Sequence, residues 1–309
     1  MWLGFSLAAY SVVGNDSIQT LGTFLSSNEE RPWYILWLFA GSILTATLVY
    51  GWAQYGGDVS YDRLAKYPVK ENMGWIYLLP PLVLMALTKT GIPVSTSFLI
   101  LTFFNEKNMY SMIQKSALGY FLAFIAAIIL YFLITNSFEK RNANTEMTSS
   151  SRKYWTVAQW FSTGFLWSQW LIQDFANIYV YLPRNISSTQ LAISLTILLS
   201  MLAYIFYRKG GNIQKIVKAK TNTSDIRSAT IVDLLFAIIL YFFKEVSNIP
   251  MSTTWVFIGL LAGRELAIKW KLNGSIHKNT SRDIFMDLGK VFFGLLISII
   301  LVFIIKWFG

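Results

Sequence analysis

Two short polar motifs lie within otherwise apolar stretches of this chain. Asn15-Asp16 belongs to the first apolar segment, and Gln173-Asp174 has the same setting in the second half. Carboxylate and amide oxygens coordinate cations such as Na⁺ inside membrane proteins. An ionised Asp at mid-membrane costs about 2.5–3.5 kcal/mol, so such residues usually face a cavity or an ion path. The candidate cation ligands are Asn15, Asp16, Gln19, Gln173, Asp174 and Asn177.

A second pair of motifs is suited to an anion. Ile92-Pro93-Val94-Ser95-Thr96 recurs as Ile249-Pro250-Met251-Ser252-Thr253. Pro fits the first position of a helix, which places the hydroxyls in the first turn, beside free amides and the positive end of the dipole. Alternatively, these hydroxyls only bond to helix carbonyls and allow close packing. The candidate anion ligands are Ser95, Thr96, Ser97, Ser252, Thr253 and Thr254.

The carboxylates conflict with an anion unless a third charge is present. Asp16 and Asp174 would repel a bound anion by several kcal/mol at a few Å. A bound cation or a proton removes this conflict, so we expect the two Asp residues to face both ligands. Na⁺ is the metal expected at Asn15, Asp16, Gln173 and Asp174. The alternative is that each Asp caps a break in a helix.

Other charged residues near the motifs have simpler interpretations. Lys89 precedes Pro93 by four residues and either approaches the site or extends to the membrane interface. Arg184 is expected at the interface, Asp233 in the first turn of an apolar helix, and Lys244-Glu245 as a local ion pair.

Composition excludes several classes of protein. Of 309 residues, 54% are hydrophobic and 14% are charged, compared with about 25% charged in a soluble domain. The chain has no Cys and one His, which excludes thiol catalysis, disulfides and Cys or His metal clusters. The net charge of +10 is not clustered as a nucleic-acid surface would require. We therefore expect neither an enzyme nor a nucleic-acid partner.

Apolar runs predict a multi-pass membrane protein. Four of them, near 35–50, 117–135, 189–207 and 291–307, contain no charged residue, as is typical of spanning helices. Other runs contain polar or helix-breaking residues midway, which predicts broken helices that line protein or water. The eight segments lie near 1–27, 31–53, 74–104, 113–135, 154–183, 189–207, 229–268 and 285–308.

The motifs repeat at nearly one offset. The Ile-Pro motifs are 157 residues apart, the Asp motifs 158, and Gly56-Gly57 and Gly210-Gly211 are 154 apart. This predicts two repeats, 1–138 and 154–309, joined by a polar linker, 139–153. The loop after Gly210 is richer in Lys and Arg than the loop after Gly56, which favours inverted repeats by the positive-inside rule. The expected fold is thus an all-α polytopic membrane protein with two inverted repeats and re-entrant hairpins at the midplane.

These motifs resemble a known family. The segment from Gly14 to Thr23 resembles the G-x-N-D-V-A-N-x-x-G-T signature of the inorganic phosphate transporter (PiT) family, and Asp174-Phe175-Ala176-Asn177 resembles its second copy. The Ile-Pro-x-Ser-Thr pairs resemble its P-V-S-T-T motifs, and Gly210 to Lys215 resembles its cytoplasmic Gly-Gly loop. The resemblance covers about 14–104 and 172–265. It implies inverted repeats with phosphate near the midplane, held by the Ser and Thr groups and flanked by Na⁺ or H⁺ sites that include both Asp residues.

The chain also departs from the family pattern. Gln173 and Gln19 stand where the family has Asn, and Phe98 and Trp255 stand where His commonly follows the Ser-Thr run. The chain is shorter, with fewer spans and no large central loop. These differences leave the anion and the coupling ion open.

The sequence thus predicts a transporter of inorganic phosphate, coupled to Na⁺ or H⁺ and working by alternating access. A sulfate or other oxyanion transporter of the same fold, or a non-transporting anion-binding membrane protein, is the alternative. No cofactor besides the coupling ion is expected. The expected location is the plasma (inner) membrane, with the bilayer as a partner, and assembly into a homodimer is left open.

Overall fold

The structure is a computed structural model that describes residues 1–70, 73–90, 94–135, 148–210, 226–246, 250–273 and 278–308. Every regular element within these ranges is a helix, as the all-α prediction requires. The elements in chain order are α1 (Trp2–Ser27), α2 (Trp33–Gln54), η1 (Trp75–Leu78), α3 (Leu79–Thr90), η2 (Ser97–Leu101), α4 (Thr102–Phe104), η3 (Glu106–Asn108), α5 (Met109–Thr135), α6 (Ser149–Asp174), α7 (Ala176–Tyr179), α8 (Ser188–Tyr207), α10 (Ile226–Val246), α11 (Thr253–Asn273) and α12 (Lys278–Phe308).

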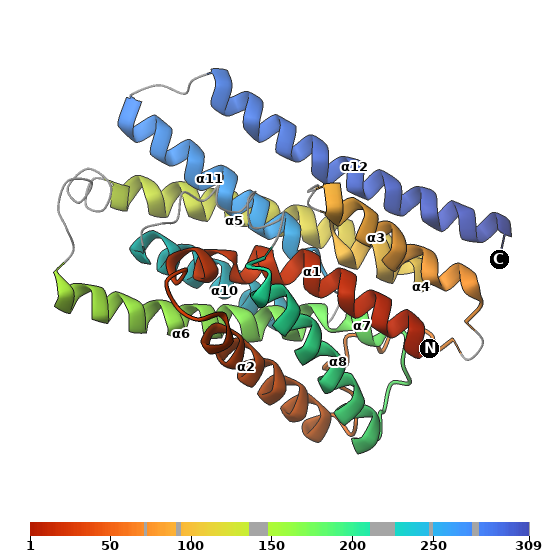
Figure 1. The fold of residues 1–309 in the computed structure, drawn as a ribbon. Coiled ribbons are helices and arrows are strands. Elements are labelled where there is room, and N and C mark those ends of the chain that lie inside the picture. The colour runs from red at the N-terminus through yellow and green to blue at the C-terminus, as the bar shows by residue number, and fades with distance from the viewer. Residues whose placement is uncertain are drawn as a thin grey trace.

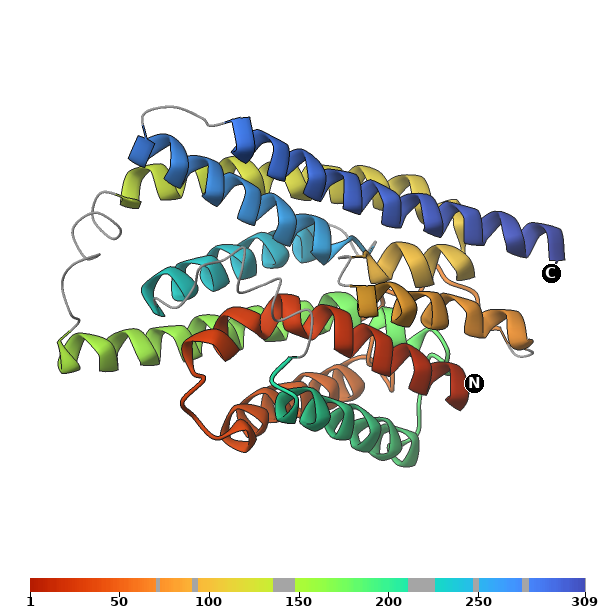
Figure 2. The ribbon, with the colours of Figure 1, turned by 45° about the horizontal axis from the view of Figure 1, so that its top comes forward.

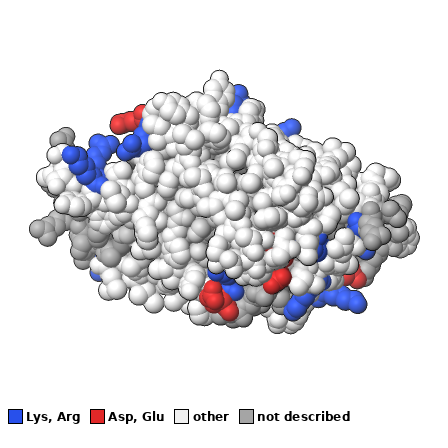
Figure 3. Space-filling view, turned by 90° about the horizontal axis from the view of Figure 1, so that it is seen from below, with Lys and Arg blue, Asp and Glu red and all other residues white. Residues whose placement is uncertain are grey.

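Four helices in the described ranges are long and apolar enough to cross a membrane. Three of them contain the predicted segments 35–50, 117–135 and 189–207. The predicted segment 291–307 lies in α12, whose apolar stretch is shorter, and α10 qualifies in addition. Figure 3 shows a face whose middle lacks charged side chains, with charges towards its left end and lower edge. The four spans are Trp33–Gln54, Glu106–Leu133, Ser188–Tyr207 and Ile226–Glu245.

The helices form a bundle around α1 and α6. Helices α2 and α8 pack together on one side, and α5, α11 and α12 lie on the other (Figure 1). Both termini lie at the same end of the bundle. Helix α3 runs toward the centre from that end, whereas α10 runs toward the centre from the opposite end (Figures 1 and 2).

Packing pairs in the first half have counterparts in the second. Helix α1 packs on α3 as α6 packs on α10, and η2 with α4 packs on α12 as α11 packs on α5. Helices α2 and α8, which occupy corresponding positions, pack on each other. Helices α3 and α10 therefore pack on the first helix of their own half, whereas the segments after the Ser-Thr motifs pack on the last helix of the other half.

Corresponding helices also end alike. The Gly57 N–H donates to the Trp52 carbonyl (2.8 Å), and the Gly210 N–H donates to the Ile205 carbonyl (3.0 Å). Both glycines have positive φ, 98° and 76°. This is the left-handed helix ending for which glycine is preferred. The recurring Gly-Gly pairs thus mark the ends of α2 and α8, although Gly211 lies outside the described residues.

One prediction about the helices is wrong. We expected a break at Asn15-Asp16, but α1 is continuous from Trp2 to Ser27. Hydroxyls within the motif bond to carbonyls one turn earlier: Ser17 Oγ donates to the Val13 carbonyl, and Thr20 Oγ1 donates to the Asp16 carbonyl (2.9 Å). The polar groups are thus satisfied without unwinding the helix. At the second motif α6 does end, at Asp174.

The other interruptions fall mainly outside the described residues. These include 91–93 and 247–249, together with most of the predicted linker 139–153, of which α6 already contains the last residues. The loop 211–225, on which the charge argument for inversion depended, is also outside.

Glycines allow α11 to approach α5 closely. A Cβ at Gly259 would collide with the Tyr120 carbonyl oxygen, and one at Gly263 would collide with the Phe124 carbonyl oxygen. Small residues four apart are the usual means of such contact between membrane helices. The approach fixes the start of α11 at the centre of the bundle.

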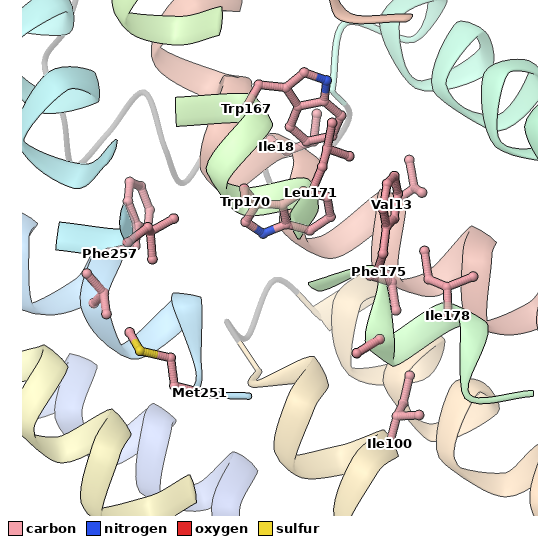
Figure 4. Close-up of a cluster of buried hydrophobic side chains, with 14 of the residues drawn as sticks. Val13, Ile18, Ile100, Trp167, Trp170, Leu171, Phe175, Ile178, Met251 and Phe257 are labelled. Carbon is pink, nitrogen blue, oxygen red and sulfur yellow. The ribbon is translucent and has the colours of Figure 1, made fainter. Parts of the chain in front are cut away.

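A continuous apolar core surrounds the polar motifs. Trp167 and Trp170 of α6 stack with ring centroids 4.9 Å apart, and Val13 and Ile18 of α1 lie beside them (Figure 4). Met251, just before α11, closes the opposite side of the cluster. The polar motifs therefore lie in a medium in which unpaired polar groups are costly.

Candidate ion-binding site

Asp16 lies in the middle of α1 and is 1% exposed. Its Oδ1 accepts from Asn15 Nδ2 (2.6 Å), and its Oδ2 accepts from Thr96 Oγ1 (2.6 Å). Asn15 Nδ2 also donates to the Val94 carbonyl (2.9 Å). The first carboxylate is therefore satisfied by residues of its own half.

Asp174 ends α6 and is fully buried. Its Oδ1 accepts from Asn177 Nδ2 (2.7 Å) and from Ser97 Oγ (3.2 Å). Its Oδ2 has no hydrogen-bond partner. Thr253 lies beside this carboxylate at the start of α11.

Thr96 and Asn177 connect the two carboxylates. Asn177 Nδ2 donates to Thr96 Oγ1 (2.9 Å), and Thr96 in turn donates to Asp16. The same amide donates to Asp174. Asp16 and Asp174 are thus linked through one side chain from each half, in a single buried network. In the described chain, neither carboxylate forms an ion pair with Lys or Arg within 4.0 Å.

The two Ser-Thr motifs exchange matching hydrogen bonds. Ser97 Oγ donates to the Met251 carbonyl (3.2 Å), and Thr254 Oγ1 donates to the Val94 carbonyl (3.2 Å). Each pair of residues is related by the 157-residue offset. The two motifs therefore meet at the centre of the molecule through an approximately two-fold arrangement.

The first Ser of each motif caps the helix that follows. Ser95 Oγ accepts from the Phe98 N–H (3.2 Å), and Ser252 Oγ accepts from the Trp255 N–H (3.2 Å). This is the pattern of an N-cap serine. The Ser252 N–H donates to Ser116 Oγ on α5 (2.8 Å). Ser116 was not predicted as part of the site, because a single Ser inside an apolar helix has no sequence signal.

Two aromatic residues, Phe98 and Trp255, follow the Ser-Thr motifs. The rings of Phe98 and Trp255 pack edge to face with centroids 5.7 Å apart. These residues are also related by the 157-residue offset. The Trp255 Nε1 is buried without a partner. At these positions no imidazole is present to bind a proton or an anion.

The unpartnered side-chain atoms around the carboxylates are mainly acceptors. Nδ2 of Asn15 and Nε2 of Gln173 donate to carbonyls, of Val94 and Leu240 respectively, which fixes the orientation of each amide. Asn177 Nδ2 is fixed in the same way by Asp174. Buried polar atoms almost always have partners, so acceptors without donors indicate a site for a bound cation or proton. The unpartnered acceptors at the motifs are Asn15 Oδ1, Gln173 Oε1, Asp174 Oδ2 and Asn177 Oδ1.

Gln19 is less involved than predicted. It is 6% exposed, and its Nε2 has no partner, whereas Asn177, at the corresponding position of the second half, makes three hydrogen bonds. Among the described residues no cluster of three Asp, Glu or His side chains could hold a metal. Any cation here would depend on amide and hydroxyl oxygens together with one or two carboxylates.

One interpretation of an isolated charge is wrong. Asp233 is not in the first turn, because α10 already begins at Ile226. It is buried and accepts from Thr23 Oγ1 (2.5 Å) and Thr163 Oγ1 (2.6 Å), which ties α10 to α1 and α6. Arg184 is half-buried and donates to the Tyr67 carbonyl (3.1 Å), and its expected position at the membrane interface stays a prediction.

Lys89 and Lys244 lie at the edge of the site. Lys89 is exposed and lines a cavity of about 160 Å³ that also borders Gly14 and Met85, and it forms no ion pair with Asp16. The predicted local ion pair is present, with Lys244 Nζ 3.3 Å from Glu245 Oε1.

Comparisons with known proteins place the fold. No protein-family model matches the chain, and no curated protein matches it in sequence. A solved structure described as "The sodium-dependent phosphate transporter" matches with a TM-score of 0.65 and 15% sequence identity, covering 99% of this chain and 98% of that one. At this identity the likeness shows the fold alone. The chain is therefore a multi-pass integral membrane protein with an all-α fold similar to that of a transporter.

Proposed function

We propose that this protein is a secondary transporter of inorganic phosphate, coupled to a cation gradient. The observation that carries the proposal is the central network, in which Asp16 and Asp174 are joined through Thr96 and Asn177. The ligands come from both halves, so a relative movement of the halves would open or close the site. The fold likeness over the whole chain supports this function.

The cation accounts for the acceptors that lack donors. A half-satisfied buried network is unfavourable, and two buried carboxylates in one network repel each other. A Na⁺ ion held by Asp174 Oδ2 and neighbouring amide oxygens would remove both penalties. We propose Na⁺ first, because the similar fold belongs to a protein named as sodium-dependent. A proton on one carboxylate is the alternative coupling ion.

The anion accounts for the hydroxyls at the hairpin tips. Ser97, Thr253 and Thr254 are buried beside Asp174 or bonded across to the other motif. Helix α11, of 21 residues, directs its N-terminus to the same place. A phosphate hydroxyl can donate a hydrogen bond to a carboxylate oxygen beside the bound cation, whereas sulfate has no proton to donate at neutral pH. Asp174 therefore favours phosphate, with sulfate as the alternative anion. The proposed anion ligands are Ser95, Thr96, Ser97, Ser252, Thr253 and Thr254.

The proposed mechanism is alternating access of two inverted repeats. Helices α3 and α10 approach the centre from opposite ends of the bundle. The packing pairs, the Gly57 and Gly210 helix endings and the reciprocal tip bonds all relate the two halves. These observations support two hairpins of opposite direction, each serving as a gate for one side of the membrane.

Uptake into liposomes tests the proposal. The purified protein is reconstituted, and accumulation of labelled phosphate is measured under a Na⁺ gradient, a proton gradient and no gradient, with labelled sulfate as the competing substrate. Accumulation of phosphate that depends on one cation gradient is expected. Equal accumulation without any gradient would contradict coupling, and preferential uptake of sulfate would replace the substrate.

A matched pair of variants separates the site from general damage. Asp174→Asn should abolish coupled uptake, whereas Lys66→Gln, which changes an exposed side chain, should not. If neither anion accumulates but phosphate raises the melting temperature of the purified protein, the protein binds anions without transporting them.

A further inference from the structure

A buried arginine lies outside the motifs discussed so far. Arg63 belongs to the segment 55–70 that follows α2, and it is only 2% exposed. Its Nη1 is buried without a hydrogen-bond partner. Burial lowers the pKa of the Arg63 guanidinium to about 10, so the side chain stays charged at neutral pH. A buried arginine with a free donor is unusual, because desolvating a charge is costly without a partner.

The segment around Arg63 is held in a fixed conformation. Asp58 Oδ1 accepts from the Ser60 N–H (2.7 Å), and Tyr61 Oη donates to the Thr47 carbonyl (2.6 Å). The Gly57 carbonyl accepts from the Ile186 N–H (3.0 Å). Tyr61 and Asp62 both adopt positive φ, 55° and 59°. These constraints direct the next residue, Arg63, into the protein instead of into solvent.

Contacts on α5 place this segment next to the central site. Tyr67 Oη donates to Met112 Sδ (3.3 Å). Met112 shares one face of α5 with Lys115 and Ser116, three and four residues further on. Ser116 in turn accepts from the Ser252 N–H. This face of α5 therefore extends from the Arg63 segment to the hydroxyls at the start of α11.

Three cations lie near this face of α5: Arg184, Arg63 and Lys115. Arg184 is half-buried and bonded to the Tyr67 carbonyl, and Lys115 of α5 is half-buried as well. Arg63 is more deeply buried, at 2% exposure, and the charges of Lys115 and Asp174 are near enough to interact electrostatically with its guanidinium. Two further carboxylates interact electrostatically with these cations: Glu245 with Arg63, and Asp58 with Arg184. In the described chain Arg63 forms no ion pair within 4.0 Å with any of them.

We propose that Arg184, Arg63 and Lys115 form a cationic access path, in which Arg63 binds the oxyanion transiently before it reaches the hydroxyls of α11. A guanidinium offers several N–H donors in a planar array that matches the oxygens of phosphate or sulfate. Arg63 keeps such a donor free. This inference rests on the proposed transport function and adds the route on the side of the 55–70 segment.

Transport kinetics test the path. Removing the charge with Arg63→Gln should raise the KM for phosphate about tenfold with little change in kcat, because the path acts on encounter. Arg63→Lys should restore most of the loss, and Lys66→Gln, an exposed cation of the same segment, should behave like the wild type. Raising the ionic strength should reduce the difference between wild type and Arg63→Gln. An unchanged KM in Arg63→Gln overturns the path while the transport function stands; absence of uptake by the wild type overturns both.

Cysteine labelling tests the path without transport. The chain has no Cys, so Arg63→Cys introduces a single thiol. With Arg184 and Lys115 in place, an anionic methanethiosulfonate reagent should modify this thiol at least about tenfold faster than a cationic reagent of equal size, and added phosphate should slow it. Lys66→Cys, which is exposed, should show little preference. A buried thiol that neither reagent reaches, or one without charge preference, overturns the path.

Discussion

The two halves of the central site have corresponding residues but satisfy their carboxylates differently. Both oxygens of Asp16 accept hydrogen bonds, from Asn15 and Thr96 of the same half. Asp174 has two donors on Oδ1, one of them Ser97 from the other half, and none on Oδ2. The Asp16 carboxylate is therefore fully hydrogen-bonded by donors of its own half. The Asp174 carboxylate has one oxygen without a donor, to which a cation or a protonated anion would bind.

The amides three positions after the carboxylates show the same asymmetry between the two halves. Asn177, three residues after Asp174, bridges to Thr96 and Ser97. Gln19, three residues after Asp16, has an unpartnered Nε2. Residues at corresponding positions of the repeated motif thus make different numbers of hydrogen bonds. The amide of the second half connects the two halves, whereas no such bond is seen from the Gln19 amide nitrogen.

The helical segments that follow the two Ser-Thr motifs differ as well. In the second half the motif is followed by the regular 21-residue helix α11. In the first half it is followed by the π-helix η2, of five residues, and the three-residue α4. Short π-helical stretches often occur at functional sites. The helical segment after the first motif is therefore the less regular of the two.

Exchanging each Asp for Asn is the strongest test of this comparison. Asp174→Asn should lower coupled uptake about 100-fold, because it removes the buried charge that faces the ligand. Its thermal stability should change little, since the new NH₂ can occupy the position of the unpartnered Oδ2. Asp16→Asn should lower uptake and also stability, by about 1–3 kcal/mol, because its NH₂ would face a donor already bonded there.

The measurements are liposome uptake and thermal unfolding in detergent, each with and without Na⁺. The wild type should gain stability from Na⁺, and Asp174→Asn should not. If both variants lose stability equally, Asp174 Oδ2 has a hydrogen-bond partner in the protein without bound ligand, and the difference between the two carboxylates is contradicted.

The amide pair provides the second test. Asn177→Ala removes the donor shared by Asp174, Thr96 and Ser97, and should destabilise the protein by about 1–3 kcal/mol and lower uptake strongly. Gln19→Ala removes a side chain whose Nε2 has no partner, and should change both by much less. Thermal unfolding and uptake are again the measurements. Equal effects of the two substitutions would show that the halves contribute alike.

Much of the architecture could be predicted from sequence. The all-α class and three of the four uncharged spans are confirmed, because uninterrupted hydrophobicity is a strong and local signal. The continuity of α1 could not be predicted. Asn15 and Asp16 interrupt a hydrophobic pattern, but their partners, Thr96 and the Val94 carbonyl, come from a distant segment. Those long-range bonds let the helix continue through the motif.

The burial of charged residues outside the motifs was missed for the same reason. Arg63 looked like one of several loop cations, and its burial follows only from the turn around Asp58 and Tyr61. Asp233 looked like a first-turn residue because the apolar run begins after Arg227. Its hydroxyl partners, Thr23 and Thr163, are 210 and 70 residues away. Pairing at such separations has no signature in a single sequence.

Asp233 marks a further difference between corresponding segments of the two halves and provides the third test. It anchors α10 to α1 and α6, whereas the corresponding first-half position is Ile76. Thr163→Val should leave one buried carboxylate oxygen without a donor and lower stability by about 1–3 kcal/mol. Thr230→Val is the matched control, because its hydroxyl only donates to the Ile226 carbonyl one turn earlier. Thermal unfolding measures both. A loss in Thr230→Val as large as in Thr163→Val would argue against an anchoring role for Asp233.

The two cap serines give the smallest and most symmetric effect. Ser95 and Ser252 accept from the N–H three residues later at equal distances, 3.2 Å. Replacing either by Ala should cost about 1 kcal/mol, as for other N-caps. Because the two hydroxyls have no common partner, the double variant should lose about the sum of the single losses, measured by thermal unfolding. A much larger loss at Ser252 would extend the asymmetry of the carboxylates to the helix starts. Equal losses would confine that asymmetry to Asp174 and Asn177, and thus to the residues that face the proposed ligand.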